Sequence, residues 1–330
     1  MKEIRLGTIG SGPIVHSILD GVLRTEGIRL EAVYSRKEET GRALAEEYGG
    51  KTVHTGLEAF LADPNVDVVY IASPNSLHYE QTRQALSAGK HVICEKPFCT
   101  RADQVRELLA LAREKRLFLI EAVPTALLPN FPVLKEHLPK LGRVKLVLGN
   151  YTQYSARYDK LLAGETPNVF NPGFAGGCLM DINYYNVYLT TALFGPPAGA
   201  RYRPNLAPNG IDTSGVVELD YPGFTASLAA SKDARGISFF QIEGEKGFIW
   251  VRDGSNGLAE VRVVTEEGDQ TFNLQPDPSR WFYEVRAIAG LIRSGDYDTA
   301  YGLLADITLP VTEAVERARL GAGLFFPGDR

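Results

Sequence analysis

Two short stretches contain residue types that could move a proton at a substrate hydroxyl. In the first, the apolar run HVI is followed by CEKP, so Glu95 and Lys96 project to opposite faces of a predicted strand. Only one of them can enter a cleft beyond the end of that strand. We favour Lys96, because an ammonium group can hydrogen-bond a substrate hydroxyl and lower the pKa of a neighbouring acid or base. A surface ion pair is the alternative for this lysine.

The second stretch, GGCLMDINYYNVYLTTALFG at residues 176–195, is an apolar helical pattern that follows two glycines. Asp181 and Tyr185 are four residues apart and therefore share one face of a helix, which Tyr188 continues one turn later. The carboxylate can orient a polyol while the phenol exchanges a proton. Because a free phenol has a pKa of about 10, this chemistry requires a cation such as Lys96 nearby. Alternatively, these tyrosines simply pack and form hydrogen bonds between domains.

A third stretch, IGSGPIV, lies between a predicted strand and a predicted helix and could bind the phosphates of a dinucleotide. Gly10 allows a tight turn, Gly12 lets the backbone approach a pyrophosphate, and Pro13 and Ile14 begin the helix whose N-terminus attracts anions. Val15 stands where the usual fingerprint has a third small residue, whose role is close packing of helix and strand. A glycine-rich loop without a ligand is the alternative.

The residues at the end of the second predicted strand indicate whether the dinucleotide is NAD or NADP. An Asp or Glu about 20 residues after the glycine turn would bind the ribose hydroxyls of NAD. Here that stretch contains Ser35, Arg36 and Lys37, and the first carboxylate, Glu38, falls in the next predicted helix. A serine and two cations suit the 2′-phosphate of NADP, and Arg36 can stack on adenine. We therefore favour NADP, with NAD as the alternative, although a solvated helix start also explains the cations.

Hydrophobic periodicity predicts the elements that position these residues. Up to residue 122, short apolar runs alternate with amphipathic helical patterns, as in a parallel sheet covered on both faces. After one helix at 129–141, strands dominate, and further helical stretches lie at 177–194, 281–293 and 299–320. Pro310 should interrupt the last of these. We predict an α/β fold with a doubly wound, dinucleotide-binding domain (1–122) and an α+β domain (123–330) built on a large, open, mostly antiparallel sheet.

Composition excludes several classes of protein. With 44% hydrophobic and 23% charged residues, the chain of 330 residues has a globular composition, and its net charge of -5 offers no basic stripe to nucleic acid. No apolar stretch is long enough to cross a membrane. Cys94, Cys99 and Cys178 lack C-x-x-C spacing, which favours buried, reduced thiols in a cytoplasmic protein. No cluster of His and Cys has metal-ligand spacing, so we expect no catalytic metal.

Residues 67–98, DVVYIASPNSLHYEQTRQALSAGKHVICEKPF, resemble the Gfo/Idh/MocA oxidoreductases, and so does the later GGCLMDINYYN. The resemblance covers essentially the whole chain. It implies an NAD(P)-dependent enzyme with an N-terminal Rossmann domain, an E-K-P motif at the end of the fifth strand and a C-terminal open sheet. It also implies that the Lys96–Pro97 bond is cis. We expect further cofactor-binding residues after the fourth and fifth strands, at Ser73, Pro74, Asn75, His78, Glu95 and Lys96.

In this family a D-x-x-x-H or D-x-x-x-Y pair supplies the acid/base group. Dihydrodiol dehydrogenases and glucose-fructose oxidoreductase are similar to this chain in having tyrosine. By that resemblance Tyr185 is the catalytic acid/base, Lys96 supports it and Asp181 positions the substrate. Two departures leave the assignment open: Asn183 replaces a common glycine, and Tyr184 could take the role of Tyr185.

The function implied is hydride transfer between nicotinamide and a carbon of a sugar, polyol or cyclic diol. The alternative is a non-catalytic, dinucleotide-binding sensor or regulatory protein of the same fold. The presence of Lys96, Asp181 and Tyr185 together favours catalysis. The open sheet predicts a homodimer or homotetramer formed through its exposed face. Arg157, Tyr158 and Lys160 could line the substrate pocket or lie on a solvated loop.

Overall fold

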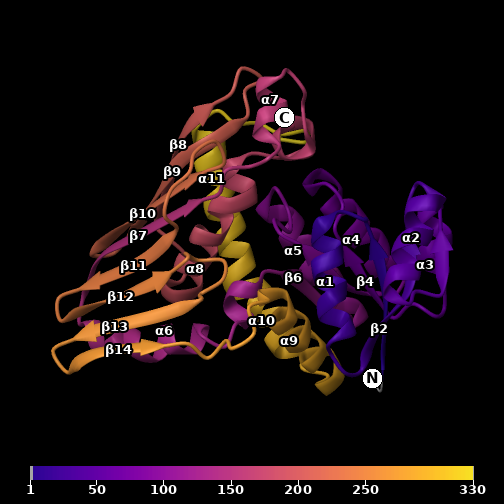
Figure 1. Cartoon of the computed structure of the whole chain (residues 1–330), viewed down its shortest axis with the longest axis horizontal. Coiled ribbons are helices and arrows are strands. Elements are labelled where there is room, and N and C mark those ends of the chain that lie inside the picture. The colour runs from indigo at the N-terminus through magenta and orange to yellow at the C-terminus, as the bar shows by residue number, and fades with distance from the viewer. Residues whose placement is uncertain (1–2, 330) are drawn as a thin grey trace. The chain divides into compact units, whose positions relative to one another are not determined.

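A computed structural model describes residues 3–329 and divides into two units (Figure 1). Among the described residues, unit 1 contains residues 3–99, 103–123 and 279–305, and unit 2 contains residues 100–102, 124–278 and 306–329. The second segment of unit 1 ends at Val123, and the sequence-based boundary lies between residues 122 and 123. Residues 279–305 belong to unit 1 by their contacts, whereas the sequence-based division included them in the second domain, 123–330.

Unit 1 is a six-stranded parallel sheet with helices on both faces, which confirms the doubly wound prediction. In sheet order its strands are β3 (Thr52–His54), β2 (Ile28–Tyr34), β1 (Ile4–Ile9), β4 (Val68–Ile71), β5 (His91–Glu95) and β6 (Leu119–Ala122). Its helices are α1 (Pro13–Leu23), α2 (Glu38–Tyr48), α3 (Leu57–Ala62), α4 (His78–Ser87), α5 (Ala102–Lys115), α9 (Arg280–Ser294) and α10 (Tyr297–Leu303). The strand order reverses between β1 and β4, and sheets of this type bind ligands beyond the carboxyl ends of strands at that point.

The late helices α9 and α10 belong to unit 1 because side chains from both pack on early elements. Helix α1 has glycine at position 21, where a Cβ atom would lie only 3.1 Å from the carbonyl oxygen of Trp281, so the two helices approach closely. The ring of Tyr297 stacks on that of Phe118 with 4.0 Å between centroids. The hydroxyl of Tyr301 donates to the carbonyl oxygen of Leu117 at 2.9 Å.

Unit 2 is built on an eight-stranded sheet in which only β7 and β10 pair in parallel among the described strands, so the mostly antiparallel prediction is confirmed. In sheet order its strands are β14 (Gly268–Phe272), β13 (Glu260–Thr265), β12 (Gly247–Arg252), β11 (Phe239–Gly244), β7 (Val144–Thr152), β10 (Phe224–Ser231), β9 (Asp212–Tyr221) and β8 (Gly199–Leu206). Its helices are α6 (Phe131–His137), α7 (Tyr158–Leu162), α8 (Tyr184–Phe194) and α11 (Leu309–Gly321).

Helices α8 and α11 cover one face of this sheet, and the other face is open (Figure 1). Alternation along β10 shows this directly, because Ala226, Leu228 and Ala230 are buried while the residues between them are partly exposed. Pro310 is the second residue of α11, directly after the π-helical turn Leu304–Thr308. The predicted interruption of the last helical stretch is therefore confirmed.

All three cysteines are free and buried, as predicted for small apolar side chains. Burial raises the pKa of each thiol. Within residues 3–329 no helix combines the length and the apolar character that crossing a bilayer demands. In the same part of the chain, no group of three or more His, Cys, Asp or Glu side chains is arranged to hold a metal ion.

Candidate functional site

The glycine turn after β1 combines one glycine that the fold requires with one that the fold does not. Gly10 has φ +115°, and a Cβ atom there would lie 2.7 Å from the carbonyl oxygen of Ala72, the residue after β4. At Gly12, in contrast, no atom lies within 4 Å of the position that a Cβ would take. Val15 is completely buried, so the larger side chain at the third fingerprint position is accommodated in the core.

The start of α1 fits the pyrophosphate of a dinucleotide. Pro13 is the first helical residue, no side chain caps the helix and its first turn contains no acidic residue. The positive end of the helix dipole therefore lies at a turn to which the described residues supply no side-chain cap. Together with the open space beside Gly12, this arrangement suits a bound phosphate group.

The end of β2 is basic in the structure. Arg36 and Lys37 are exposed, and the Ser35 hydroxyl donates to the carbonyl oxygen of Lys37 at 2.8 Å. Glu38 is the first residue of α2, as predicted, and its carboxylate accepts a hydrogen bond from Nε of Arg42 at 3.0 Å. Glu38, the first carboxylate after this basic stretch, is therefore paired with Arg42 of the same helix.

A buried histidine joins the loops that follow β4 and β5. His78 begins α4 and is 1% exposed; its Nδ1 lies 2.9 Å from the carbonyl oxygen of Pro97, and its Nε2 lies 2.8 Å from that of Ser73. Burial lowers the pKa of His78 and the nearby charge of Lys96 adds to this effect, so the neutral ring donates to only one carbonyl at a time. The 3₁₀ turn at Asn75–Leu77 follows Pro74, and the Lys96–Pro97 peptide bond is cis, as expected.

Glu95 and Lys96 have different surroundings, as expected for neighbours that project to opposite faces. Glu95 is 7% exposed and its Oε1 accepts a hydrogen bond from the Tyr70 hydroxyl at 2.7 Å, whereas Lys96 is half-exposed. Burial raises the pKa of Glu95 to about 7, although the Tyr70 hydrogen bond and the Lys96 charge oppose the shift. The carboxylate of Glu121 accepts a hydrogen bond from the backbone N–H of Phe98 at 3.0 Å and so holds the segment just after the cis peptide bond.

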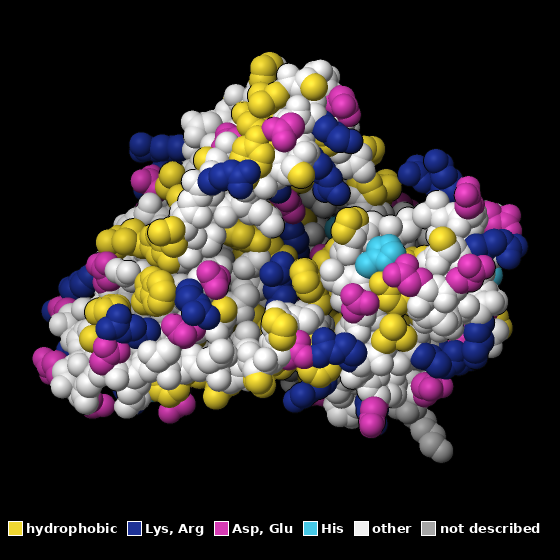
Figure 2. All heavy atoms as spheres, viewed as in Figure 1, with side chains coloured by type: hydrophobic (Ala, Val, Ile, Leu, Met, Phe, Trp, Pro, Cys, Tyr) yellow, Lys and Arg dark blue, Asp and Glu magenta, His cyan; other side chains and the backbone are white. Residues whose placement is uncertain are grey.

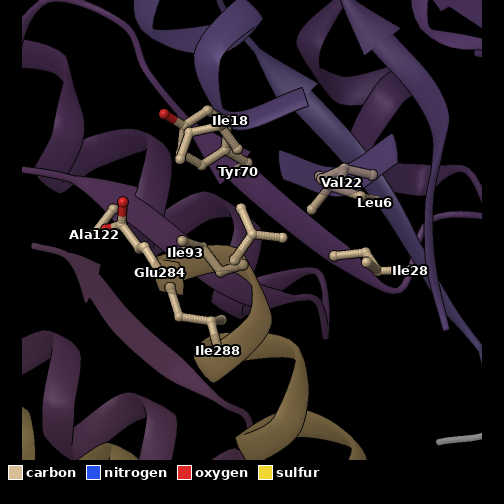
Figure 3. A pocket seen from close by; sticks show the side chains of 10 residues that line it. Leu6, Ile18, Val22, Ile28, Tyr70, Ile93, Ala122, Glu284 and Ile288 are labelled. Carbon is tan, nitrogen blue, oxygen red and sulfur yellow. The ribbon is translucent and has the colours of Figure 1, made fainter. Parts of the chain in front are cut away.

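Another carboxyl group is buried in unit 1 beside a small apolar cavity. Glu284 of α9 is 1% exposed, and its Oε1 has no hydrogen-bond partner among residues 3–329. Burial and the negative charges of Glu95 and Glu121 raise the pKa of Glu284, while Arg280 opposes this. The cavity is about 20 Å³ and is lined by Leu6, Ile18, Val22, Ile28, Tyr70, Ile93, Ala122, Glu284, Val285 and Ile288 (Figure 3).

We expect Glu284→Gln to reduce the loss of stability between about pH 5 and about pH 8. A carboxyl whose folded pKa is raised stabilises the fold fully below its unfolded pKa, and this contribution is lost as pH rises through the folded pKa. For Glu95 that window runs from 4.5 to about 7 and corresponds to about 3 kcal/mol. Glu284→Gln removes a carboxyl group whose pKa is raised in the folded state. It also removes a negative charge that would repel the carboxylate of Glu95.

Thermal unfolding at several pH values tests this expectation. The Glu284→Gln melting temperature should match wild type near pH 5 and exceed it by about 3 °C or more near pH 8. Glu58→Gln, a change at an exposed carboxylate of α3, is the matched control and should follow wild type throughout. Parallel curves for Glu284→Gln and wild type would show that Glu284 is ionised in the folded state.

In unit 2, an irregular turn places Asp181 before α8. Gly177 has φ +106°, and a Cβ atom there would collide with Oδ1 of Asp212. Asp212 is 1% exposed, and its Oδ2 accepts hydrogen bonds from the Leu179 N–H and the Tyr202 hydroxyl, both at 2.7 Å. Burial raises the pKa of Asp212, and these hydrogen bonds oppose the shift. The close approach of Asp212 to Gly177 and its hydrogen bond from Leu179 thus hold the backbone where the helical segment begins.

The segment Leu179–Asn183 is a π-helical turn, and α8 begins only at Tyr184. The sequence-based prediction assumed one uninterrupted α-helix here. Tyr184 is completely buried with its ring 6.4 Å from that of Tyr188, whereas Tyr185 is 7% exposed with its ring 6.0 Å from that of Tyr151. Tyr188 therefore packs with Tyr184. Such π-helical turns are common at functional sites.

At the position where many relatives have glycine, the side chain of Asn183 has hydrogen-bond partners on both of its polar atoms. This side chain is completely buried, and its Nδ2 donates to the carbonyl oxygen of Leu228 in β10 at 2.9 Å. Asn186 donates to Asn183 Oδ1 at 2.9 Å, and the Ser255 hydroxyl donates to Asn186 Oδ1 at 2.7 Å. These hydrogen bonds join the start of α8 to the sheet and hold the turn that contains Asp181.

Lys232 was not among the predicted site residues, and it forms an ion pair with Asp181. Lys232 lies one residue beyond β10 and its side chain is 4% exposed, while that of Asp181 is 31% exposed. The only sequence signal was a lysine directly after the apolar, small-residue strand FTASLAAS. Asp212 and Tyr151 were also missed, because nothing in the sequence indicates which side chain a strand residue will meet.

The structure groups the predicted residues in two sets. The predicted cofactor-binding residues and Lys96 lie in unit 1, at or just beyond the carboxyl ends of β1, β2, β4 and β5, and Asp181 and Tyr185 lie in unit 2. Arg157 and Lys160 are exposed on and next to α7. Tyr158 is partly buried, with its ring 6.0 Å from that of Phe170.

Comparisons with known proteins match both units. Residues 4–122 match the model described as "Oxidoreductase family, NAD-binding Rossmann fold", and residues 139–250 match the GFO/IDH/MocA C-terminal domain. The chain is 36% identical to the uncharacterized oxidoreductase YgjR of Escherichia coli (99% of this chain, 98% of that one). It is 34% identical to the NADP(+)-dependent scyllo-inositol 2-dehydrogenase IolU of Bacillus subtilis (99% of each chain). A crystal structure of KijD10, a 3-ketoreductase from Actinomadura kijaniata in complex with NADP and TDP-benzene, is similar with TM-score 0.83 and 25% identity (97% of this chain, 98% of that one).

Proposed function

Because this chain belongs to the Gfo/Idh/MocA oxidoreductases, we propose that it oxidises or reduces a CH–OH carbon of a sugar, polyol or cyclic diol with NADP. In the oxidative direction, the alcohol and NADP⁺ become a carbonyl compound, NADPH and a proton. The observation that carries this proposal is the pairing of Asp181 and Tyr185 at the start of α8 in a chain that also has Lys96 directly after β5. A sensor needs a dinucleotide site but no proton-transfer group.

Each unit supplies a different part of the chemistry. Residues of unit 1 hold the dinucleotide, which supplies or accepts the hydride when bound. Tyr185 exchanges the proton of the reacting hydroxyl, Lys96 stabilises the ionised phenol, and Asp181 positions the substrate. The glycine turn and the start of α1 would hold the phosphates, and the loops after β2, β4 and β5 would supply the remaining contacts.

A preference for NADP is supported by the basic end of β2. Arg36 and Lys37 are exposed beside Ser35, and Glu38, the nearest carboxylate, pairs with Arg42. A 2′-phosphate would gain two charged partners here, whereas residues 35–37 offer no carboxylate to the ribose hydroxyls of NAD. The relative named as an NADP(+)-dependent scyllo-inositol 2-dehydrogenase also supports NADP. On this basis scyllo-inositol is the first substrate to test, followed by D-xylose and a cyclic diol.

Fluorescence titration with NADPH and NADH tests the cofactor site. Two glycine variants test whether the glycine turn is part of that site. We expect tighter binding of NADPH than of NADH. Gly12→Ala should weaken NADPH binding about tenfold or more and leave the melting temperature unchanged, because a Cβ there meets no protein atom but enters the phosphate site. Gly10→Ala should destabilise the fold by about 1–3 kcal/mol, because of its positive φ and the Ala72 carbonyl.

Two outcomes would contradict this assignment. If Gly12→Ala bound NADPH as tightly as wild type, the dinucleotide would not lie on this turn. If wild type bound neither NADPH nor NADH at micromolar concentrations, the proposed oxidoreductase activity would be rejected for this chain. Gly10→Ala serves as the matched control, since its effect is on stability whether or not a ligand is present.

The open face of the sheet in unit 2 supports a homodimer or homotetramer. Half-buried apolar side chains point outward from its central strands, with hydrophobic atoms visible over β10 to β12 in Figure 2. They are Leu146, Leu148, Phe239, Phe248, Trp250 and Val264. An apolar face of this kind is typical of a surface that a second copy covers.

Light scattering measures the expected assembly. Wild type should have at least twice the mass of one chain, and Trp250→Asp should dissociate it, because a carboxylate would lose its hydration in the interface. Ile237→Asp, at a residue that is 79% exposed in the segment before β11, is the control and should leave the assembly intact. A wild-type monomer at micromolar concentration would reject this interface.

Cysteine chemistry supports a reducing compartment. The three thiols are free and buried, and burial raises the pKa of each. Proteins with unpaired thiols suit the cytoplasm, where disulfides are rare. We therefore place this enzyme in the cytoplasm.

A further inference from the structure

The ion pair between Lys232 and Asp181 has unequal exposure. The lysine side chain is 4% exposed and the carboxylate is 31% exposed, so a buried cation faces an anion that reaches the surface of unit 2. A buried ammonium group is strongly unfavourable without a partner, whereas a partly exposed carboxylate still has water. Lys232 therefore needs Asp181 as a partner for its buried charge, whereas Asp181 also has access to water.

The backbone of Lys232 is held on both sides, which fixes where its side chain starts. Its N–H donates to the carbonyl oxygen of Thr213 at 2.8 Å, and its own carbonyl accepts the N–H of Ser155 at 2.9 Å. The ammonium group lies 6.0 Å from the centre of the completely buried Phe170 ring, within the range of a cation–π contact. The aliphatic chain is thus enclosed, and the cation points to Asp181.

Neighbouring carboxylates have partners of their own. Asp233 accepts hydroxyl hydrogen bonds from Thr213 at 2.6 Å and Ser231 at 2.8 Å, and these lower its pKa despite burial. Asp212 is occupied by the Leu179 N–H and the Tyr202 hydroxyl. Asp181 is therefore the carboxylate that Lys232 serves.

We propose that Lys232 is a positioning residue whose charge holds the Asp181 carboxylate oriented to accept a hydrogen bond from a substrate hydroxyl beside the reacting carbon. This inference rests on the proposed function and narrows its substrate class to vicinal diols and polyols. Asp181 lies in the π-helical turn and Tyr185 is the second residue of α8, four positions later, so a substrate that reaches both side chains needs a second hydroxyl for Asp181 beside the one that reacts at Tyr185. The charge of Lys232 also offsets that of Asp181, which would otherwise oppose an ionised phenol nearby.

The test compares Lys232→Met, Lys232→Arg, Asp181→Asn and the double variant Asp181→Asn/Lys232→Met with wild type. With scyllo-inositol as probe, Lys232→Met should raise KM about tenfold or more and change kcat less than about threefold, because an oriented charged acceptor is lost from binding. Lys232→Arg should restore most of the wild-type KM, and NADPH affinity should not change.

Thermal unfolding supplies a readout that needs no substrate. Asp181→Asn leaves a buried cation unpaired and should lower the melting temperature more than Lys232→Met does, and the double variant should recover most of that loss. Lys246→Met, at an exposed lysine in the turn between β11 and β12, should behave as wild type in every assay.

The outcomes separate this proposal from the proposed function. If wild type turned over no polyol while the melting temperatures followed the expected pattern, the ion pair would stand and the oxidoreductase assignment would fail. If wild type were active but Lys232→Met left KM within about twofold, or if the effects of Lys232→Met and Asp181→Asn on KM were additive, the positioning role would be overturned.

Discussion

Replacing Tyr185 by Phe should lower turnover by about 10²- to 10⁴-fold and leave NADPH affinity within about twofold of wild type, because only the proton-transfer group is removed. The substitution deletes one oxygen atom and keeps the ring, which packs 6.0 Å from that of Tyr151. Steady-state kinetics with scyllo-inositol and NADP⁺, together with NADPH titration, measure both quantities. A general acid/base affects the chemical step, so the loss should appear in kcat and in kcat/KM alike.

Tyr184→Phe is the matched control for this experiment. Tyr184 is completely buried, and its ring lies against Tyr188, so its hydroxyl is enclosed in unit 2. We expect a change in turnover below about tenfold for this variant. If the two results were exchanged, Tyr184 would be the acid/base group. If Tyr185→Phe reduced turnover less than tenfold as well, neither tyrosine would be, and the regulatory alternative would gain support.

Replacing Lys96 by Met should lower kcat/KM by about 10²- to 10³-fold and move the pH profile of the oxidation to higher pH, since an ionised phenol then lacks its cation. Lys96 is half-exposed directly after β5, next to a peptide bond that His78 and Glu121 hold through neighbouring backbone groups. Lys96→Arg keeps the charge but moves it, so it should retain part of the activity. Initial rates across the pH range provide the profile.

The control for Lys96 is Lys115→Met, at an exposed lysine near the end of α5. It removes the same charge from unit 1 and should leave kcat/KM and the pH profile unchanged, because exposed charges farther away are screened by salt. A Lys96→Met enzyme with wild-type kcat/KM would contradict the role of this cation. A loss without any shift of the pH profile would indicate that Lys96 binds substrate or cofactor and does not tune the phenol.

The sequence alone was sufficient for the fold class, the family and the general chemistry. Strands such as VVYI in the stretch VDVVYIAS are continuously apolar and lie between amphipathic helices, which is typical of a parallel sheet covered on both faces. The α/β fold, the open sheet and the NAD(P)-dependent oxidoreductase class are confirmed by the structure and by the family models. The roles given to Lys96, Asp181 and Tyr185, and the cofactor contacts, stay predictions that the experiments above address.

Only the tertiary structure decided which partners these residues have. Periodicity reports how deeply each element is buried but not which element buries it, so nothing in the sequence assigned α9 and α10 to unit 1. Asp212 of β9, a strand distant in sequence, accepts a hydrogen bond from the N–H of Leu179, the first residue of the π-helical turn that contains Asp181. In the same way, Lys232 meets Asp181 because β10 ends beside that turn, a contact across 51 residues that no local pattern encodes.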